Sequence, residues 1–183
     1  MNREEALVLL KEYTKKDGLI KHALAVEASM RAYAIKFEQD PDTWGIVGLL
    51  HDFDYEKYPD MEDHPYKGAE ILKERNLPGE WITAILSHAS HTGVPRDTIM
   101  AKTLFAVDEL CGFITAVAYV RPNRKLAEVA VKSVKKKMKD KAFARQVNRD
   151  EIREGATLIG QPLEEHIEFV IHAMQNIADE LGL

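Results

Sequence analysis

Histidines are concentrated in one part of the chain. Five of the seven histidines lie between positions 22 and 91. Imidazole and carboxylate ligands together suit Zn, Mn, Fe and similar divalent ions, whereas calcium sites are built mainly from oxygen ligands. The single cysteine, Cys111, is a small core residue by its apolar neighbours, which argues against a thiolate-rich structural zinc site. Candidate ligands for a divalent metal ion include His22, His51, Asp52 and Asp108.

Each of these residues also has an ordinary structural explanation. His22 alone is typical of a hydrogen-bonded core or boundary histidine, and the adjacent His51 and Asp52 are typical of helix-end capping. Asp108 is harder to explain, because it lies in an apolar segment and an ionised carboxylate facing a core needs a cation or hydrogen-bond donors. The alternatives are that Glu109 faces inward instead or that Asp108 is solvated.

The elements that must position these side chains are helices. Apolar residues recur at intervals of three and four, and no segment shows the sustained alternation of a half-buried strand. The pattern predicts an all-α fold, a helical bundle of about eight to ten helices. The predicted helices cover residues 3–15, 19–38, 41–52, 65–74, 78–88, 97–119, a basic amphipathic segment after Pro122, 148–159 and 162–183.

The candidate ligands fall on separate predicted helices. His22 shares one stripe with Val26, Met30 and Tyr33, so it points toward the core. The pair His51-Asp52 ends the helix that opens at Pro41, and residues 53–63 have no helical period and are predicted to form a loop.

A wider pattern surrounds the histidine-aspartate pair. An apolar run, Val47-Gly48-Leu49-Leu50, leads into His51-Asp52, and it is followed by His64-Pro65-Tyr66-Lys67-Gly68-Ala69-Glu70-Ile71-Leu72, then by His88 and Asp108. This order resembles the HD superfamily of metal-dependent phosphohydrolases over roughly residues 19–120. We therefore expect a single domain over residues 1–183, with a metal-binding core at 19–120 and a C-terminal helical extension at 121–183.

The resemblance implies a ligand set. His22, His51, Asp52 and Asp108 would bind a first metal, and His64 and His88 match the positions that add a second metal in members with two. Asp52 would then bridge the two ions. The implied cofactors are one or two divalent transition metal ions, Mn, Fe, Zn, Co or Ni, and the implied nucleophile is a metal-activated hydroxide.

Two further features concern substrate and catalysis. His91 follows His88 by three residues, so it would contact the substrate or protonate the leaving group if the helix continued another turn; otherwise it is a plain loop histidine. Asp54 and Glu56 follow the pair in an acid-rich loop, where they are solvated or orient water. Asp52 and His91 are the predicted catalytic residues.

The sequence departs from some branches of the family. Members that cleave cyclic dinucleotides commonly have Ile-Gly-Lys after the pair and two adjacent histidines further on, whereas Phe53-Asp54-Tyr55 and His88-Ala89 stand here. The departure argues against cyclic dinucleotide phosphodiesterase activity.

Basic residues are concentrated between Arg121 and Arg149. If this face borders the site, Lys135 and Lys136 would hold substrate phosphates, because a cationic rim attracts anions. The alternative is a solvated helix face. Nucleic-acid binding is disfavoured, because no recognised module accompanies the charge.

The sequence therefore predicts a metal-dependent phosphohydrolase that cleaves a small phosphoester or nucleotide. Two alternatives share the same residues: a mixed-valence di-iron oxygenase of the same superfamily, and a non-catalytic metal- or ligand-binding regulatory module. The formal net charge of −5 provides no global attraction to nucleic acid or membranes. The acidic N-terminal residues do not resemble a signal peptide, and residues 110–120 are too few to cross a bilayer, so we expect a cytoplasmic protein, with a homodimer as the default assembly.

Overall fold

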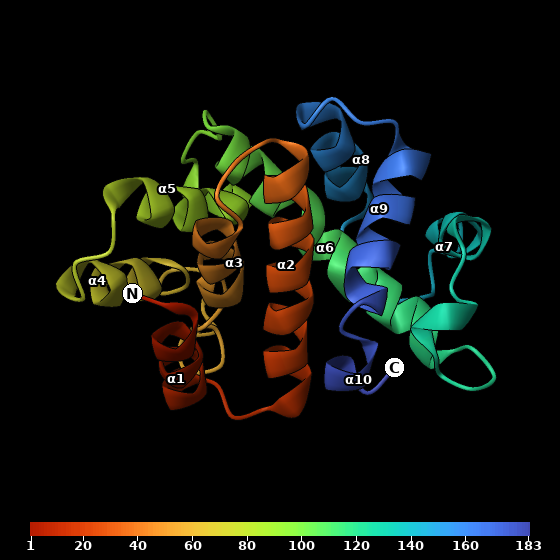
Figure 1. Ribbon diagram of the computed structural model, residues 1–183, viewed down its shortest axis with the longest axis horizontal. Coiled ribbons are helices and arrows are strands. Elements are labelled where there is room, and N and C mark those ends of the chain that lie inside the picture. The colour runs from red at the N-terminus through yellow and green to blue at the C-terminus, as the bar shows by residue number, and fades with distance from the viewer.

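The computed structural model describes residues 1–183 as an assembly of helices without a strand, which confirms the predicted all-α fold (Figure 1). The α-helices are α1 (Arg3–Tyr13), α2 (Asp17–Lys36), α3 (Pro41–Leu50), α4 (Tyr66–Glu74), α5 (Gly79–His88), α6 (Ile99–Tyr119), α7 (Val131–Met138), α8 (Arg149–Leu158), α9 (Leu163–Gln175) and α10 (Ala178–Leu181). Two short 3₁₀ segments, η1 (Ser90–Thr92) and η2 (Leu126–Glu128), interrupt the connections. None of the helices combines the length and the apolar composition that crossing a membrane needs.

Local signals in the sequence fix several helix starts. The side chain of Asn2 accepts the backbone N–H of Glu5, whose own side chain accepts the N–H of Asn2 in return. Asp40 caps α3 through the backbone N–H groups of Asp42 and Thr43. These side-chain caps satisfy N–H groups that have no partner inside the helix, which is why they mark its beginning.

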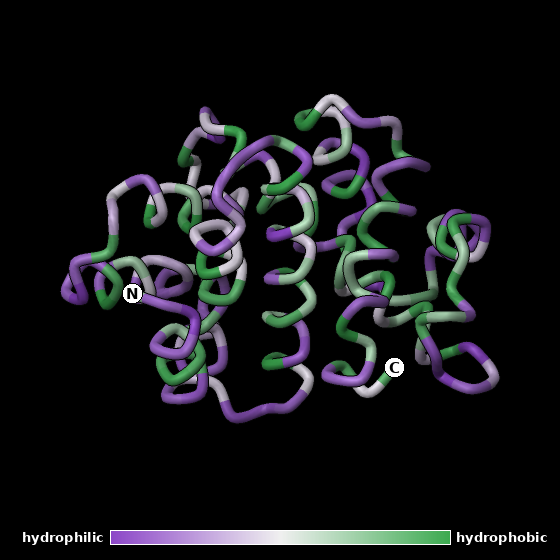
Figure 2. Tube along the Cα trace, in the orientation of Figure 1, coloured by the Kyte–Doolittle hydropathy of each residue, from purple (hydrophilic) through white to green (hydrophobic).

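Helix α2 occupies the middle of the molecule and packs against both α3 and α6 (Figure 1). Its stripe of Val26, Met30 and Tyr33 is fully buried, as predicted. Figure 2 shows the connection between α1 and α2 as hydrophilic, whereas α2 itself alternates between polar and apolar residues. One cluster of 42 buried apolar residues extends from Ala6 to Leu183. The helices that carry the candidate ligands are therefore held by a common core.

Helix α8 approaches α6 very closely at Gly155. A Cβ atom at this position would lie 2.5 Å from the Cα of Ala106 and 3.0 Å from its Cβ. Only glycine allows this approach, because any side chain would push the two helices apart. The contact fixes the C-terminal helices against the helix that carries Asp108.

The basic segment and the C-terminal segment were each predicted as one helix, and both are interrupted. Val129 and Ala130 are extended between η2 and α7, which allows Leu126, Val129 and Val134 all to be buried. The last segment divides at Ile177 into α9 and α10. Tertiary burial overrides helical periodicity at both places.

Candidate metal centre

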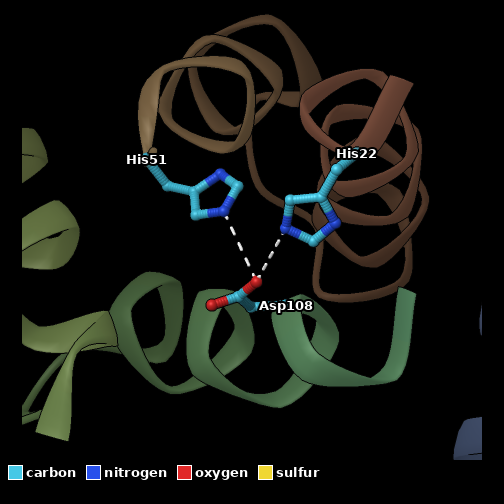
Figure 3. A group of neighbouring side chains, drawn as sticks. All are labelled: His22, His51 and Asp108. Carbon is cyan, nitrogen blue, oxygen red and sulfur yellow. Dashed lines mark hydrogen bonds and ion pairs between the residues drawn. The ribbon is translucent and has the colours of Figure 1, made fainter. Parts of the chain in front are cut away.

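Helices α2, α3 and α6 bring His22, His51 and Asp108 together (Figure 3). His22 lies in α2, His51 caps the C-terminus of α3, and Asp108 lies in α6. The Oδ1 atom of Asp108 is 3.0 Å from Nε2 of His22 and 3.4 Å from Nε2 of His51. We call these three residues the first group. Asp108 thus faces the histidines, and the cost of placing its carboxylate inside is offset by them.

A second group consists of Asp52, His64 and His88. The Oδ1 atom of Asp52 is 3.2 Å from Nε2 of His64 and 3.1 Å from Nε2 of His88. His64 precedes α4 and His88 is the last residue of α5. The loop that follows α3 and the end of α5 therefore meet at this carboxylate.

His51 joins the two groups. Its Nε2 atom lies 3.5 Å from Oδ2 of Asp52 and 3.4 Å from Oδ1 of Asp108. The His51 side chain is completely buried, and neither its Nε2 nor Oδ1 of Asp52 has a hydrogen-bond partner. Buried polar atoms are rarely left without a partner, so these two atoms indicate a missing ligand.

The hydrogen bond made by Nδ1 of each histidine shows whether its Nε2 carries a proton or a lone pair. In His51, His64 and His88, Nδ1 contacts an atom that can only accept a hydrogen bond, so Nδ1 carries the proton. The acceptors are the carbonyl of Gly48, the carboxylate of Asp54 and the carbonyl of Ile85. The Nε2 lone pairs therefore face carboxylate oxygens, which are also acceptors.

A cation resolves this conflict between acceptors. Without one, the carboxylates promote protonation: burial lowers the pKa of His64, but hydrogen bonds and charge from Asp52 and Asp54 outweigh burial and raise the pKa to about 9. The pKa values of His51 and His88 are raised in the same way, against the effect of burial. A divalent ion supplies the same positive charge, and neutral imidazole with carboxylate suits transition metals. The residues present thus fit a metal centre.

Asp54 is buried instead of solvated, contrary to one prediction for the acid-rich loop. Its Oδ1 accepts Nδ1–H of His64 at 2.9 Å, and its Oδ2 accepts the backbone N–H of Gly68 at 2.8 Å. A carboxylate behind a histidine ligand fixes the ring orientation and the tautomer. Glu56 has a different role, since it accepts the backbone N–H groups of Lys15 and Lys16 beside the start of α2.

Both groups border a pocket of about 600 Å³ lined by fifteen residues. Five of these residues are the candidate ligands His22, Asp52, His64, His88 and Asp108. The lining also includes Glu109 from α6 and Glu151 from α8, with Gln146 and Val147 from the segment before α8. A helix outside residues 19–120 therefore contributes to the pocket.

Glu109 lines the pocket beside Asp108, so the two residues are not alternatives as the sequence suggested. Burial and the charge of Asp108 raise the pKa of the Glu109 carboxyl to about 7. Neither Glu109 nor Glu151 was predicted as a site residue. The sequence position of Glu109, next to the candidate ligand Asp108, could have indicated that it lies at the site. Glu151 has no such indication in the sequence, because only the packing of α8 on α6 brings it to the pocket.

His91 lines the pocket, but not because α5 continues. The helix ends at His88, and His91 lies in the 3₁₀ segment η1. Its Nε2 contacts the backbone carbonyl of His64 at 3.0 Å. Because a carbonyl can only accept, this nitrogen carries a proton and Nδ1 is the atom that remains for other contacts.

The fifteen residues that line this pocket do not include Lys135 and Lys136, the predicted substrate-binding residues. Both lie on α7 and line a separate groove of about 450 Å³, where Lys135 pairs with Glu164. None of the fifteen residues around the main pocket is Lys or Arg. Residues 121–149 contain eleven Lys and Arg and two Asp and Glu, a net charge of +9, whereas the remaining residues carry −14. The positive charge is therefore concentrated in one segment, and none of its Lys and Arg side chains lines the main pocket.

Comparison with known families agrees with this geometry. The HD domain model matches residues 19–112, just over half of the chain, and the match includes both groups of candidate ligands. The chain belongs to the HD domain family. This HD domain protein is thus a member of a superfamily of metal-dependent phosphohydrolases, whose domains bind divalent metals. No solved structure matches the chain significantly.

Proposed function

We propose that this HD domain protein is a metal-dependent phosphohydrolase that cleaves a small phosphoester or nucleotide. The observation that carries the proposal is the pair of adjoining His/Asp groups, joined through His51 and Asp52, that border the pocket. The unpartnered Nε2 of His51 and Oδ1 of Asp52 support metal binding in particular.

In the proposed centre, His22, His51 and Asp108 hold one ion, and His64 and His88 hold a second. Asp52 contributes to both, because its two oxygens face different groups. Divalent ions in such a centre supply Lewis-acid stabilisation of phosphoryl oxygens and acidify water.

The remaining polar residues orient these side chains and the substrate. Asp54 holds His64 so that its Nε2 faces Asp52. His91 keeps its Nε2 proton on the carbonyl of His64, so the neutral ring presents Nδ1 as an acceptor to a substrate. Leaving-group protonation by His91 therefore requires a second proton on that ring.

The test combines metal content with turnover. Protein purified without added metal is analysed for metal identity and stoichiometry, then reloaded and assayed against phosphomonoesters, phosphodiesters and nucleotides. We expect two equivalents and hydrolysis of at least one class, with activity abolished by chelation.

Metal-loaded protein that hydrolyses none of these compounds would contradict the proposal. Oxygen consumption with a mixed-valence iron spectrum would support the oxygenase alternative. Thermal stabilisation by metal with neither activity would support a non-catalytic module.

A further inference from the structure

Two carboxylates line the pocket in addition to those of the candidate ligands. Glu109 accepts the backbone N–H of Asn148 through Oε2 at 3.2 Å, and Glu151 accepts the hydroxyl of Ser90 through Oε1 at 2.9 Å. In each side chain the other oxygen has no hydrogen bond to the protein. Two carboxylate oxygens in the lining therefore remain as acceptors for a ligand.

The pocket has no lining cation for a second anionic group, since the nearby Arg96 donates to the lining residue Ser90 and to the carbonyl of His88. Its volume of about 600 Å³ falls within the range of pockets that enclose small organic molecules, so more than a phosphate fits. No Lys or Arg lines it, and the cationic groove on α7 is built from other residues. A second phosphate would meet the negative charge of Glu151, and that of Glu109 above its pKa of about 7, which disfavours binding.

We infer that the pocket selects phosphomonoesters whose organic part carries hydrogen-bond donors, hydroxyl or ammonium groups, which Glu109 and Glu151 accept. The inference rests on the proposed phosphohydrolase function and narrows its substrate class. Polyphosphates and substrates with a distal carboxylate are disfavoured by the same two side chains. Glu109 and Glu151 are thus specificity-determining residues.

Four monoesters with the same three-carbon length test this selection. They are propyl phosphate, glycerol phosphate, 3-aminopropyl phosphate and 3-phosphoglycerate, which differ in the groups away from the phosphate. With metal-loaded protein we expect kcat/KM for glycerol phosphate or 3-aminopropyl phosphate to exceed that for propyl phosphate by about tenfold, with 3-phosphoglycerate lowest. The better of the two substrates identifies hydroxyl or ammonium recognition. Equal values for the four esters, or a preference for 3-phosphoglycerate, would overturn the inference.

Substitutions assign the preference to these carboxylates. Glu151→Gln and Glu109→Gln keep the side-chain length and should each reduce the preference for the donor-bearing ester over propyl phosphate. Glu151→Lys should shift the preference toward 3-phosphoglycerate. Glu168→Gln is the matched control, since Glu168 is exposed on α9 and does not line the pocket. An unchanged ratio in all three pocket variants would overturn the assignment.

Binding without turnover separates this inference from the proposed function. Calorimetric titration of metal-loaded protein with 3-aminopropylphosphonate, 2,3-dihydroxypropylphosphonate and propylphosphonate measures the selection alone. About tenfold tighter binding of the amino or the dihydroxy compound than of propylphosphonate, lost in Glu151→Gln, supports the selection even if no ester is cleaved. Hydrolysis of esters with equal binding of the three phosphonates would leave the phosphohydrolase function standing and reject the selection.

Discussion

The two groups of candidate ligands are assembled in different ways. In the first group, 86 residues separate His22 from Asp108, and three helices must pack correctly to bring the side chains together. The second group lies entirely within residues 52–88, where a loop and a buried carboxylate, Asp54, set the geometry. The first group therefore depends on the packing of the helical core, and the second depends on local hydrogen bonds.

The largest effect is expected at Asp52, which faces both groups. Asp52→Asn removes the negative charge that Nε2 of His51, His64 and His88 all face. We expect both metal equivalents to be weakened and kcat/KM to fall at least about a thousandfold. Metal analysis and steady-state kinetics measure the two effects. Asp60→Asn, an exposed residue of the same loop, is the control. A variant that keeps both metals would show that the groups are independent.

Low pH should destabilise the packing of the helices that hold the first group, because it promotes protonation of His166. This fully buried imidazole contacts the hydroxyl of Tyr33 on α2 and the carbonyl of Ala106 on α6, so it links the helices of His22 and Asp108. Burial lowers its pKa to about 4. In the unfolded state His166 binds a proton as the pH falls below about 6.5, where an unperturbed histidine titrates. In the folded state it stays neutral until the pH approaches its lowered pKa, so the proton favours unfolding between these values.

The stability linked to His166 should be complete above about pH 6.5, and about 3 kcal/mol should be lost as the pH falls to 4. Urea unfolding of the wild type and of His166→Gln across this range measures the difference. Comparison with the variant cancels the contribution of the carboxylates. If both proteins lose the same stability, His166 does not titrate as described.

Gly155→Ala should disturb the packing of α8 on α6, the helix that carries Asp108 of the first group. The added methyl group would overlap Ala106, two residues before Asp108, and the backbone there cannot move aside. We expect a loss of about 2 kcal/mol in the free energy of unfolding. Gly18→Ala is the matched control, because a Cβ there meets nothing within 4 Å. Equal stability of the two variants in thermal or urea unfolding would contradict the close packing.

The smallest and most selective effect is expected at Asp54. Asp54→Asn retains the size of the side chain but removes the charge behind His64 and places an amide near the N–H of Gly68. Loss of such a carboxylate costs about tenfold to a hundredfold in metal affinity. Titration with metal should show that loss for one equivalent only. Equal loss of affinity for both metal equivalents would contradict the claim that Asp54 supports only the second group.

The sequence predicted what local signals encode. The caps at Asn2 and Asp40 and the proline at position 41 mark helix starts within a few residues of the observed ones. The apolar stripe of α2 was also readable, since helical periodicity shows which face is buried. The HD pattern identified the residues that the structure brings into two groups, because their order in the chain is characteristic.

Features that depend on distant packing were not readable. Asp54 stands in an acid-rich segment that is typical of a solvated loop, and only the fold shows that it is buried behind His64. Lys135 and Lys136 were assigned to the substrate because charge is visible in a sequence, whereas the position of α7 is not. Glu151 was missed for the same reason, since it reaches the pocket only through the contact of α8 with α6.

The separation of charge along the chain has a consequence for behaviour at charged surfaces. Residues 121–149 carry +9 and the remainder −14, and α7 lies at an edge of the molecule (Figure 1). Such a protein has a large electric dipole, so its retention on an ion exchanger depends on local charge as well as on the net value. At neutral pH and low ionic strength it should bind a cation exchanger through α7 despite its net charge of −5. That contact uses no residue of the main pocket, so the immobilised protein would keep its pocket lining uncovered.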